Sequence, residues 1–182
     1  AAGVRLPGGV LGGTGPCLPW RAEAVQSEGW AAVLAHAIAG RPGWNVLVFP
    51  TIPLGVGGAN FIGGQTSFPG SYNVTSSTLR SVYMDLVDEL GEQGFKKIFV
   101  VDIHGAPLHN QTLHDVGDYF EATYGGTMAH LAGLMPVFSA SFLRLPTPEQ
   151  NKENGEMDWH AGAQETSARL APRPYPVRRG AE

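Results

Sequence analysis

The sequence lacks a long apolar run, a strong excess of charge of either sign and a second cysteine. No apolar stretch reaches the ~20 residues that a membrane-spanning helix needs. With 12 Lys and Arg against 16 Asp and Glu, the net charge of -4 offers no basic surface for nucleic acid or anionic lipid. Cys17 is the sole cysteine, so neither an internal disulfide nor a cysteine-rich zinc site can form. We therefore expect no nucleic-acid partner and no membrane partner.

The 182 residues suffice for one domain with a substantial core, and we expect a single domain over residues 1–182. A hydrophobic content of 43% and a charged content of 15% argue against a disordered chain. Glycine (25) and proline (14) are abundant without a repeat, which indicates many tight loops. The first residue is Ala1 rather than Met; we expect a cytoplasmic protein, and the sequence leaves secretion open.

Apolar periodicity predicts strands and helices in alternation. The expected strands cover residues 4–11, 46–49, 96–102 and 135–142, and the expected helices cover residues 23–39, 78–93, 111–124 and 160–170. The buried stripes are expected to be Val25, Trp30, Val33, Leu34 and Ile38 in the first helix, and Leu79, Val82, Tyr83, Leu86 and Leu90 in the second. This alternation implies right-handed crossovers and a mostly parallel sheet covered on both faces, an α/β fold.

The segment DIHGAPLHN, from Asp102 to Asn110, directly follows the clearest predicted strand. Loops at the carboxyl ends of parallel strands are where such sheets form their sites. His104, followed by Gly105, is therefore placed to act as a metal ligand or as a base. The alternative is a structural turn in which His104 hydrogen-bonds to the backbone and Asn110 caps the next helix.

The segment WHAGAQETS places Trp159, His160 and Glu165 around the start of the last predicted helix. Five residues separate His160 from Glu165, so both reach one point only if His160 precedes the helix. The alternative is an ordinary helix start, with Trp159 in the core rather than lining a pocket for a flat substrate. Two further segments are rich in turn residues: residues 6–23, with LPGG and GGTGPCLP, and the FPGS segment that begins at Phe68.

Taken in order, these four segments resemble the creatininase (creatinine amidohydrolase) family over residues 6–179. The family pattern runs LP-x-G, EQHGPHLP, GTD, FPGT, NGHGGN and HAGE-x-ETS; this sequence has LPGG, GGTGPCLP, RAE, FPGS, DIHGAP and HAGAQETS. The resemblance implies a three-layer α/β/α sandwich and a hydrolase of C–N amide bonds, cyclic or linear. It further implies divalent metal, zinc or manganese, that activates a water molecule. A small-molecule amide substrate and a homo-oligomer, a hexamer in many members, are also implied.

Carried over by position, the resemblance assigns residues of this chain to roles in the site. His104 and Glu165 become metal ligands, and Glu23 stands where the family has a bridging aspartate. His160 becomes the acid/base residue. Trp159 and Phe68 are the expected substrate contacts.

The first loop departs from the family pattern, because Gly12, Thr14 and Cys17 stand where the family has a glutamate and two histidines. Glycine has no ligand atom, and a hydroxyl is a poor zinc ligand. The sequence therefore favours a single ion on His104, Glu23 and Glu165 over the family's two. The alternative is a non-catalytic creatininase-fold protein, a small-molecule binder or assembly subunit, that has lost part of its metal site.

Other residues receive structural interpretations. His109 and His114 could extend His104 into a histidine cluster, but we interpret His109 as lying near a helix N-terminus and His114 as lying on that helix's exposed face. A nucleophilic role for Cys17, with a histidine as base, is the weakest reading. The chain also stops soon after HAGAQETS, so we expect a family member that is shortened there or lacks a tail.

Overall fold

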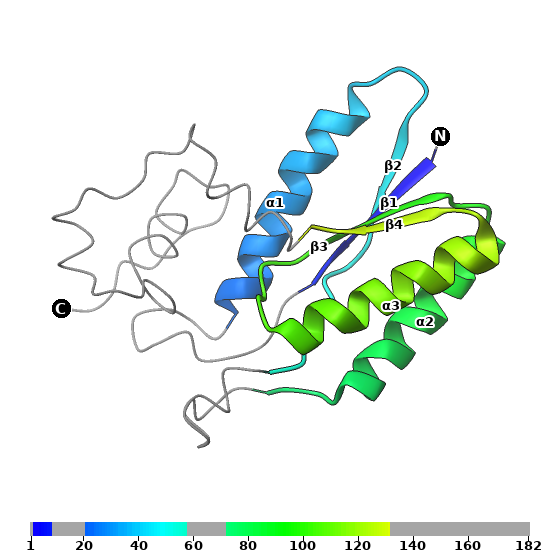
Figure 1. The fold of residues 1–182 in the computed structure, drawn as a ribbon. Coiled ribbons are helices and arrows are strands. Elements are labelled where there is room, and N and C mark those ends of the chain that lie inside the picture. The colour runs from blue at the N-terminus through cyan, green and yellow to red at the C-terminus, as the bar shows by residue number, and fades with distance from the viewer. Residues whose placement is uncertain (1, 9–20, 58–71, 132–182) are drawn as a thin grey trace, which may run out of the picture.

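The computed structural model describes residues 2–8, 21–57 and 72–131, which contain four strands and three long helices (Figure 1). Strands and helices alternate, as predicted. In chain order the elements are β1 (Ala2–Pro7), α1 (Ala22–Ala39), β2 (Asn45–Val48), α2 (Ser76–Glu92), β3 (Lys97–Val101), α3 (Pro107–Tyr124) and β4 (Thr127–His130). None of the helices in these ranges is long and apolar enough to cross a membrane.

The four described strands form one sheet in the order β2-β1-β3-β4, and every neighbouring pair is parallel. The crossover through α1 leads from β1 to β2 at one edge of the sheet. The crossovers through α2 and α3 lead in the opposite direction, first to β3 and then to β4. Right-handed crossovers therefore place α1 on one face of the sheet and α2 with α3 on the other (Figure 1). The predicted α/β class with a mostly parallel sheet is confirmed. The direction in which successive strands are added to the sheet, here called the winding direction, therefore reverses between β1 and β3.

The main core lies between the sheet and the pair α2 and α3. Strand β3 reads KIFVV, a nearly continuous apolar run typical of a strand buried on both faces. The fully buried apolar side chains of this layer are Val4, Leu6, Leu79, Tyr83, Val87, Ile98, Val100, Val116 and Phe120. The predicted stripe of α2 is confirmed at three positions, while Val82 and Leu86 are only partly buried. Thr75 caps α2 by accepting a hydrogen bond from the Thr78 amide.

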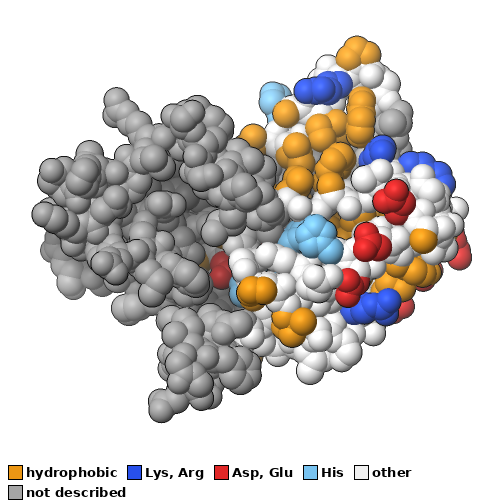
Figure 2. Space-filling model, viewed as in Figure 1, with side chains coloured by type: hydrophobic (Ala, Val, Ile, Leu, Met, Phe, Trp, Pro, Cys, Tyr) orange, Lys and Arg blue, Asp and Glu red, His pale blue; other side chains and the backbone are white. Residues whose placement is uncertain are grey.

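Helix α1 packs differently from the prediction. It buries small and polar residues, namely Ala22, Glu23, Ala24, Gln26, Ser27 and Ala31. Trp30 is 45% exposed and Val33 is 61% exposed, so the predicted apolar stripe is wrong at these two positions. Apolar residues lie all around this helix, so periodicity did not single out one face, and the face with small side chains packs inward. Figure 2 shows hydrophobic side chains gathered on the surface in the region of α1 and β2.

Helix α3 begins earlier than predicted. It starts at Pro107, because a proline at the first helical position has a suitable φ and lacks only an amide that would be unpaired there. It ends at Tyr124 and is followed by Gly125, whose φ of 61° is the left-handed conformation common after helices. Strand β4 follows and was not predicted. The predicted strand at 135–142 and helix at 160–170 lie outside the described residues.

Candidate functional site

Four segments meet at the carboxyl edge of the sheet, where the winding direction reverses. Asp102 and His104 follow β3, and Glu23 lies in the first turn of α1. His109 lies in the first turn of α3, and the stretch after β2 contributes Val56. In open parallel sheets this reversal point is where ligands bind, since the adjacent loops diverge there.

Glu23 and His104 form a buried pair at this edge. Glu23 Oε2 lies 3.2 Å from His104 Nδ1, and the two side chains are 9% and 8% exposed. The other ring nitrogen, Nε2, lies 2.9 Å from the Val56 carbonyl oxygen, so it carries a proton and donates to that oxygen. Burial alone would lower the pKa of His104, but the hydrogen bond and the charge of Glu23 raise it above the ordinary value. His104 therefore presents Nδ1 to a carboxylate.

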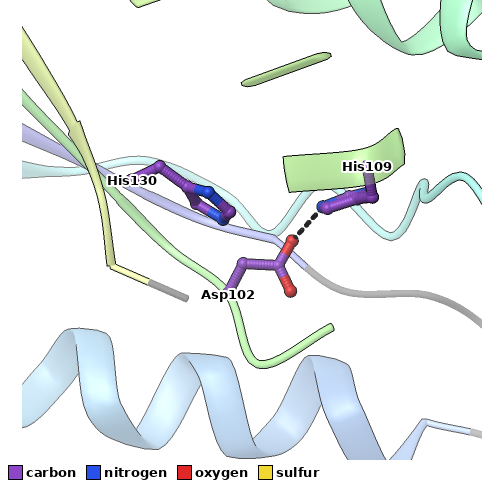
Figure 3. A group of neighbouring side chains, drawn as sticks. All are labelled: Asp102, His109 and His130. Atoms are coloured by element: carbon purple, nitrogen blue, oxygen red, sulfur yellow. Dashed lines mark hydrogen bonds and ion pairs between the residues drawn. The ribbon is translucent and has the colours of Figure 1, made fainter. Parts of the chain in front are cut away.

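Asp102 and His109 form a second buried pair next to the first, with the His104 and His109 ring centroids 5.0 Å apart. The two side chains point toward each other (Figure 3). His109 Nε2 lies 2.6 Å from Asp102 Oδ2, and both side chains are fully buried. The Val56 amide donates to His109 Nδ1 over 3.2 Å, so Nδ1 is unprotonated and Nε2–H is the donor to Asp102. Burial tends to raise the pKa of Asp102, but the hydrogen bonds from His109 and from the His104 amide lower it below its usual value. Asp102 is therefore an ionised acceptor.

The end of β1 approaches this aspartate so closely that only glycine fits there. A Cβ atom on Gly8 would lie 2.9 Å from Asp102 Oδ2 and 3.1 Å from Tyr83 Oη. The Tyr83 hydroxyl is buried and has no hydrogen-bond partner among the described residues. Burial, together with the Asp102 charge, raises the pKa of Tyr83, which keeps the hydroxyl protonated. The absence of a side chain at Gly8 lets the strand end pass next to the buried carboxylate.

Asp102, His109 and His130 also offer one ligand atom each, all within 4.8 Å of one another. Two ligands held about 2.1 Å from one ion lie roughly 3.0–3.4 Å apart. The 2.6 Å separation of Asp102 and His109 is shorter than that, and His109 Nε2 carries the bridging proton. The 3.2 Å separation of Glu23 Oε2 and His104 Nδ1 does fit. Within the described ranges, the spacing of Glu23 and His104 thus suits a shared ion better than that of Asp102 and His109.

His130, at the end of β4, is a neutral histidine beside the second pair. Its ring centroid lies 6.1 Å from that of His109, and its Nε2 is buried without a hydrogen-bond partner in the described part of the chain. Burial lowers its pKa to about 4; the charge of Asp102 opposes this, and the other histidines add to it. The unfolded state therefore takes up a proton before the folded state does as the pH falls.

This histidine should make the protein acid-labile over a defined range. Stability is lost between about pH 6.5 and pH 4, by up to about 3 kcal/mol, because the folded pKa lies below the unfolded one. We expect His130→Gln to flatten the fall in unfolding free energy over that range, measured by urea titration at several pH values. His36→Gln, on the exposed side of α1 and not among the groups that shift the pKa of His130, is the control. If the unfolding free energy of His130→Gln falls between about pH 6.5 and pH 4 as steeply as that of the wild type, His130 is not the cause of the acid lability.

The structure brings together two of the residues singled out from the sequence, Glu23 and His104. The structure confirms that His104 hydrogen-bonds to the backbone, through Nε2, whereas its role as a metal ligand or base stays a prediction. The prediction that Asn110 caps a helix is wrong, since α3 already begins at Pro107. The other predicted site residues lie outside the described ranges: Phe68, Trp159, His160 and Glu165, together with Gly12, Thr14 and Cys17 of the first loop.

Sequence reasoning gave Asp102 no role and gave His109 a structural one. The available signal for Asp102 was its position, as a carboxylate directly after the most apolar strand. His109 was harder to link to it, because the predicted helix began at residue 111. With α3 starting at Pro107, His109 falls in the first turn and contacts the strand end.

The fold and the site define an α/β protein whose parallel sheet carries buried histidine–carboxylate pairs at its carboxyl edge. A family model described as creatininase, creatinine amidohydrolase, matches residues 2–182. The chain belongs to the creatininase family. No curated protein sequence matches the chain.

Solved structures of low identity share the fold. One is a Bacteroides fragilis NCTC 9343 protein assigned as a creatinine amidohydrolase, 24% identical, with a TM-score of 0.66; the match covers 91% of this chain and 58% of that one. A manganese creatininase is 20% identical, with a TM-score of 0.67 and coverage of 94% and 65%. A creatininase variant of Zn-Zn type is 18% identical, with a TM-score of 0.66 and the same coverage. The chain thus spans about three fifths of the length of these proteins.

Proposed function

We propose that the protein is a metal-dependent amidohydrolase that cleaves a C–N amide bond, cyclic or linear, in a small molecule. The observation that carries this proposal is the buried pair of Glu23 and His104 at the reversal point of the sheet. Membership of the creatininase family supports the reaction class. The structural relatives described as manganese and Zn-Zn forms support zinc or manganese as the ion.

The residues present fit such an ion. His104 Nδ1 and Glu23 Oε2 would hold it, and Glu165 is the proposed third ligand. A histidine with two carboxylates is a donor set that binds zinc in catalytic sites. When bound, the ion polarises the amide carbonyl and activates water for attack. We propose one ion rather than two, because the first loop has Gly12 and Thr14 at the positions of family ligands.

The chain's own residues would prepare and complete the reaction. His104 must lose any proton on Nδ1 before that atom can bind metal, so protons and metal compete for the pair with Glu23. His160 is the proposed acid/base residue that carries protons between water and the leaving nitrogen. Trp159 and Phe68 are the proposed contacts to the substrate. Assembly into a homo-oligomer remains part of the proposal.

The loss of ligands in the first loop favours one competing function. Gly12 and Thr14 cannot replace a glutamate and a histidine as zinc ligands. A creatininase-fold protein that binds a small molecule or another subunit, without catalysis, is therefore the second candidate.

The two candidates differ in metal-dependent turnover. The full 182-residue chain is treated with chelator, reloaded with zinc or manganese, and assayed by NMR against cyclic ureides, lactams, formamides and linear amides. We expect hydrolysis only after reloading, and a loss of about 100-fold or more in Glu23→Gln. Glu28→Gln, in the same helix, is the matched control. Tight metal binding without hydrolysis of any of these amides would support the non-catalytic candidate. So would a rate of amide turnover that His160→Ala leaves unchanged.

A further inference from the structure

Four buried hydrogen bonds form a closed ring that joins the two pairs through one peptide backbone. Asp102 Oδ2 accepts from His109 Nε2 over 2.6 Å, and His109 Nδ1 accepts from the Val56 amide over 3.2 Å. The Val56 carbonyl accepts from His104 Nε2 over 2.9 Å. The His104 amide closes the ring by donating to Asp102 Oδ1 over 2.7 Å. Val56 is 48 residues before His104 and 53 residues before His109 in the sequence.

The backbone of Val56 fixes the direction of the three bonds that involve a histidine ring. An amide nitrogen can only donate, and a carbonyl oxygen can only accept. His109 must therefore accept at Nδ1 and donate from Nε2, which requires a permanent acceptor at Asp102. His104 must donate from Nε2, which leaves Nδ1 as the ring nitrogen with a lone pair once His104 is neutral. That atom is the one facing Glu23.

We propose that Asp102 and His109 are positioning residues that act through Val56 to hold His104 in the tautomer whose Nδ1 binds metal. The inference rests on the proposed metal site of Glu23 and His104. Partners of metal-binding histidines commonly fix the tautomer and the ring orientation, and they change affinity without touching the ion. Here the partner of His104 is a carbonyl that is itself held by a second histidine and a buried carboxylate.

The alternative, that Asp102 and His109 are themselves ligands, does not agree with the ring. Metal at His109 Nε2 would displace the proton that bonds to Asp102. The neutral ring would then carry its proton on Nδ1, facing the Val56 amide hydrogen. Two donors would oppose each other in a buried position, which costs the desolvation of both groups. The ring is therefore better suited to orient a ligand than to supply one.

Asp102→Asn is the most specific test, because it keeps the size of the side chain while it removes the charge and one of the two acceptor oxygens. One oxygen of the carboxylate becomes an NH2 donor. If that donor faces His109, the histidine must reverse its tautomer against the Val56 amide; if it faces His104, it opposes the His104 amide. One bond of the ring is lost in either orientation.

The readouts are zinc affinity, by competition with a chromophoric chelator, and the cadmium-113 to nitrogen-15 coupling in the histidine-labelled, cadmium-loaded 182-residue protein. In the wild type we expect the His104 coupling at Nδ1. In Asp102→Asn we expect zinc affinity to fall about 10- to 100-fold and the Nδ1 coupling to weaken or disappear. His114→Gln, on the exposed side of α3, is expected to change neither readout. A folded Asp102→Asn protein with wild-type affinity and an intact Nδ1 coupling would overturn the inference.

A second pair of variants keeps the test decisive where Asp102→Asn does not fold. His109→Gln retains a donor for Asp102 and an acceptor for the Val56 amide, whereas His109→Phe retains neither. We expect the phenylalanine variant to lose affinity about 10- to 100-fold and the glutamine variant to recover most of it. Equal affinities in both would overturn the inference. A wild type that binds no zinc or cadmium would instead refute the proposed metal site, and the positioning role with it.

Discussion

Replacing His104 with alanine is expected to reduce bound divalent metal from about one equivalent to background. His104 is the only proposed imidazole ligand, and Nδ1 lies 3.2 Å from Glu23 Oε2. Removing it leaves carboxylates alone, which hold zinc weakly without a nitrogen donor. The measurement is inductively coupled plasma mass spectrometry on protein purified without chelator. The variant should also lose metal-dependent amide hydrolysis.

His114→Ala is the control for this experiment, since it removes an exposed imidazole from α3. We expect it to retain the metal. Full metal content in the His104 variant would place the ion elsewhere, and the group of Asp102, His109 and His130 would be the first place to look. Two equivalents in the wild type would mean that residues beyond the described ranges complete a second site.

Replacing Asp102 with leucine is expected to lower the free energy of unfolding by about 3–5 kcal/mol. The change leaves the His109 Nε2–H and the His104 amide without acceptors in a buried position. Burial alone disfavours the ionised aspartate, and its hydrogen bonds more than compensate, as the lowered pKa indicates. Urea unfolding at pH 7 measures the loss. Asp85→Leu, on the exposed side of α2, is the matched control.

A double variant separates the cost of an orphaned partner from the value of the pair. In Asp102→Leu/His109→Leu both polar side chains are replaced by apolar ones, which is often far less costly than removing one partner. We expect the double variant to lose about 1–3 kcal/mol less unfolding free energy than the two single variants lose when their losses are added. Strict additivity, or a loss below about 1 kcal/mol in the single variant, would show that the 2.6 Å contact contributes little.

The elements with one clear apolar period were predictable from the sequence. Strand β3 is an unbroken apolar run, and α2 carries large apolar residues at three- to four-residue spacing. Helix α1 has apolar residues on every side, so periodicity could not choose the face that packs. Strand β4 has only the four residues TMAH, too short and too polar to stand out.

The candidate site was predictable only where the side chain itself carries the chemistry. His104 was found from its position after a strand, and Glu23 from the order of motifs shared with the creatininase family. The role of Val56 is carried by its amide and carbonyl, which every residue except proline possesses. No residue type marks such a position, so the link between the two histidines required three-dimensional geometry.

Glu23 and His104 are proposed to share a divalent ion that Asp102 and His109 do not bind. Anomalous diffraction at the zinc edge, from crystals of the zinc-loaded full chain, tests both parts at once. We expect an anomalous peak about 2.1 Å from His104 Nδ1 and bonded to a Glu23 oxygen, with the Asp102–His109 hydrogen bond intact. A peak between Asp102, His109 and His130, or none near His104, would contradict it.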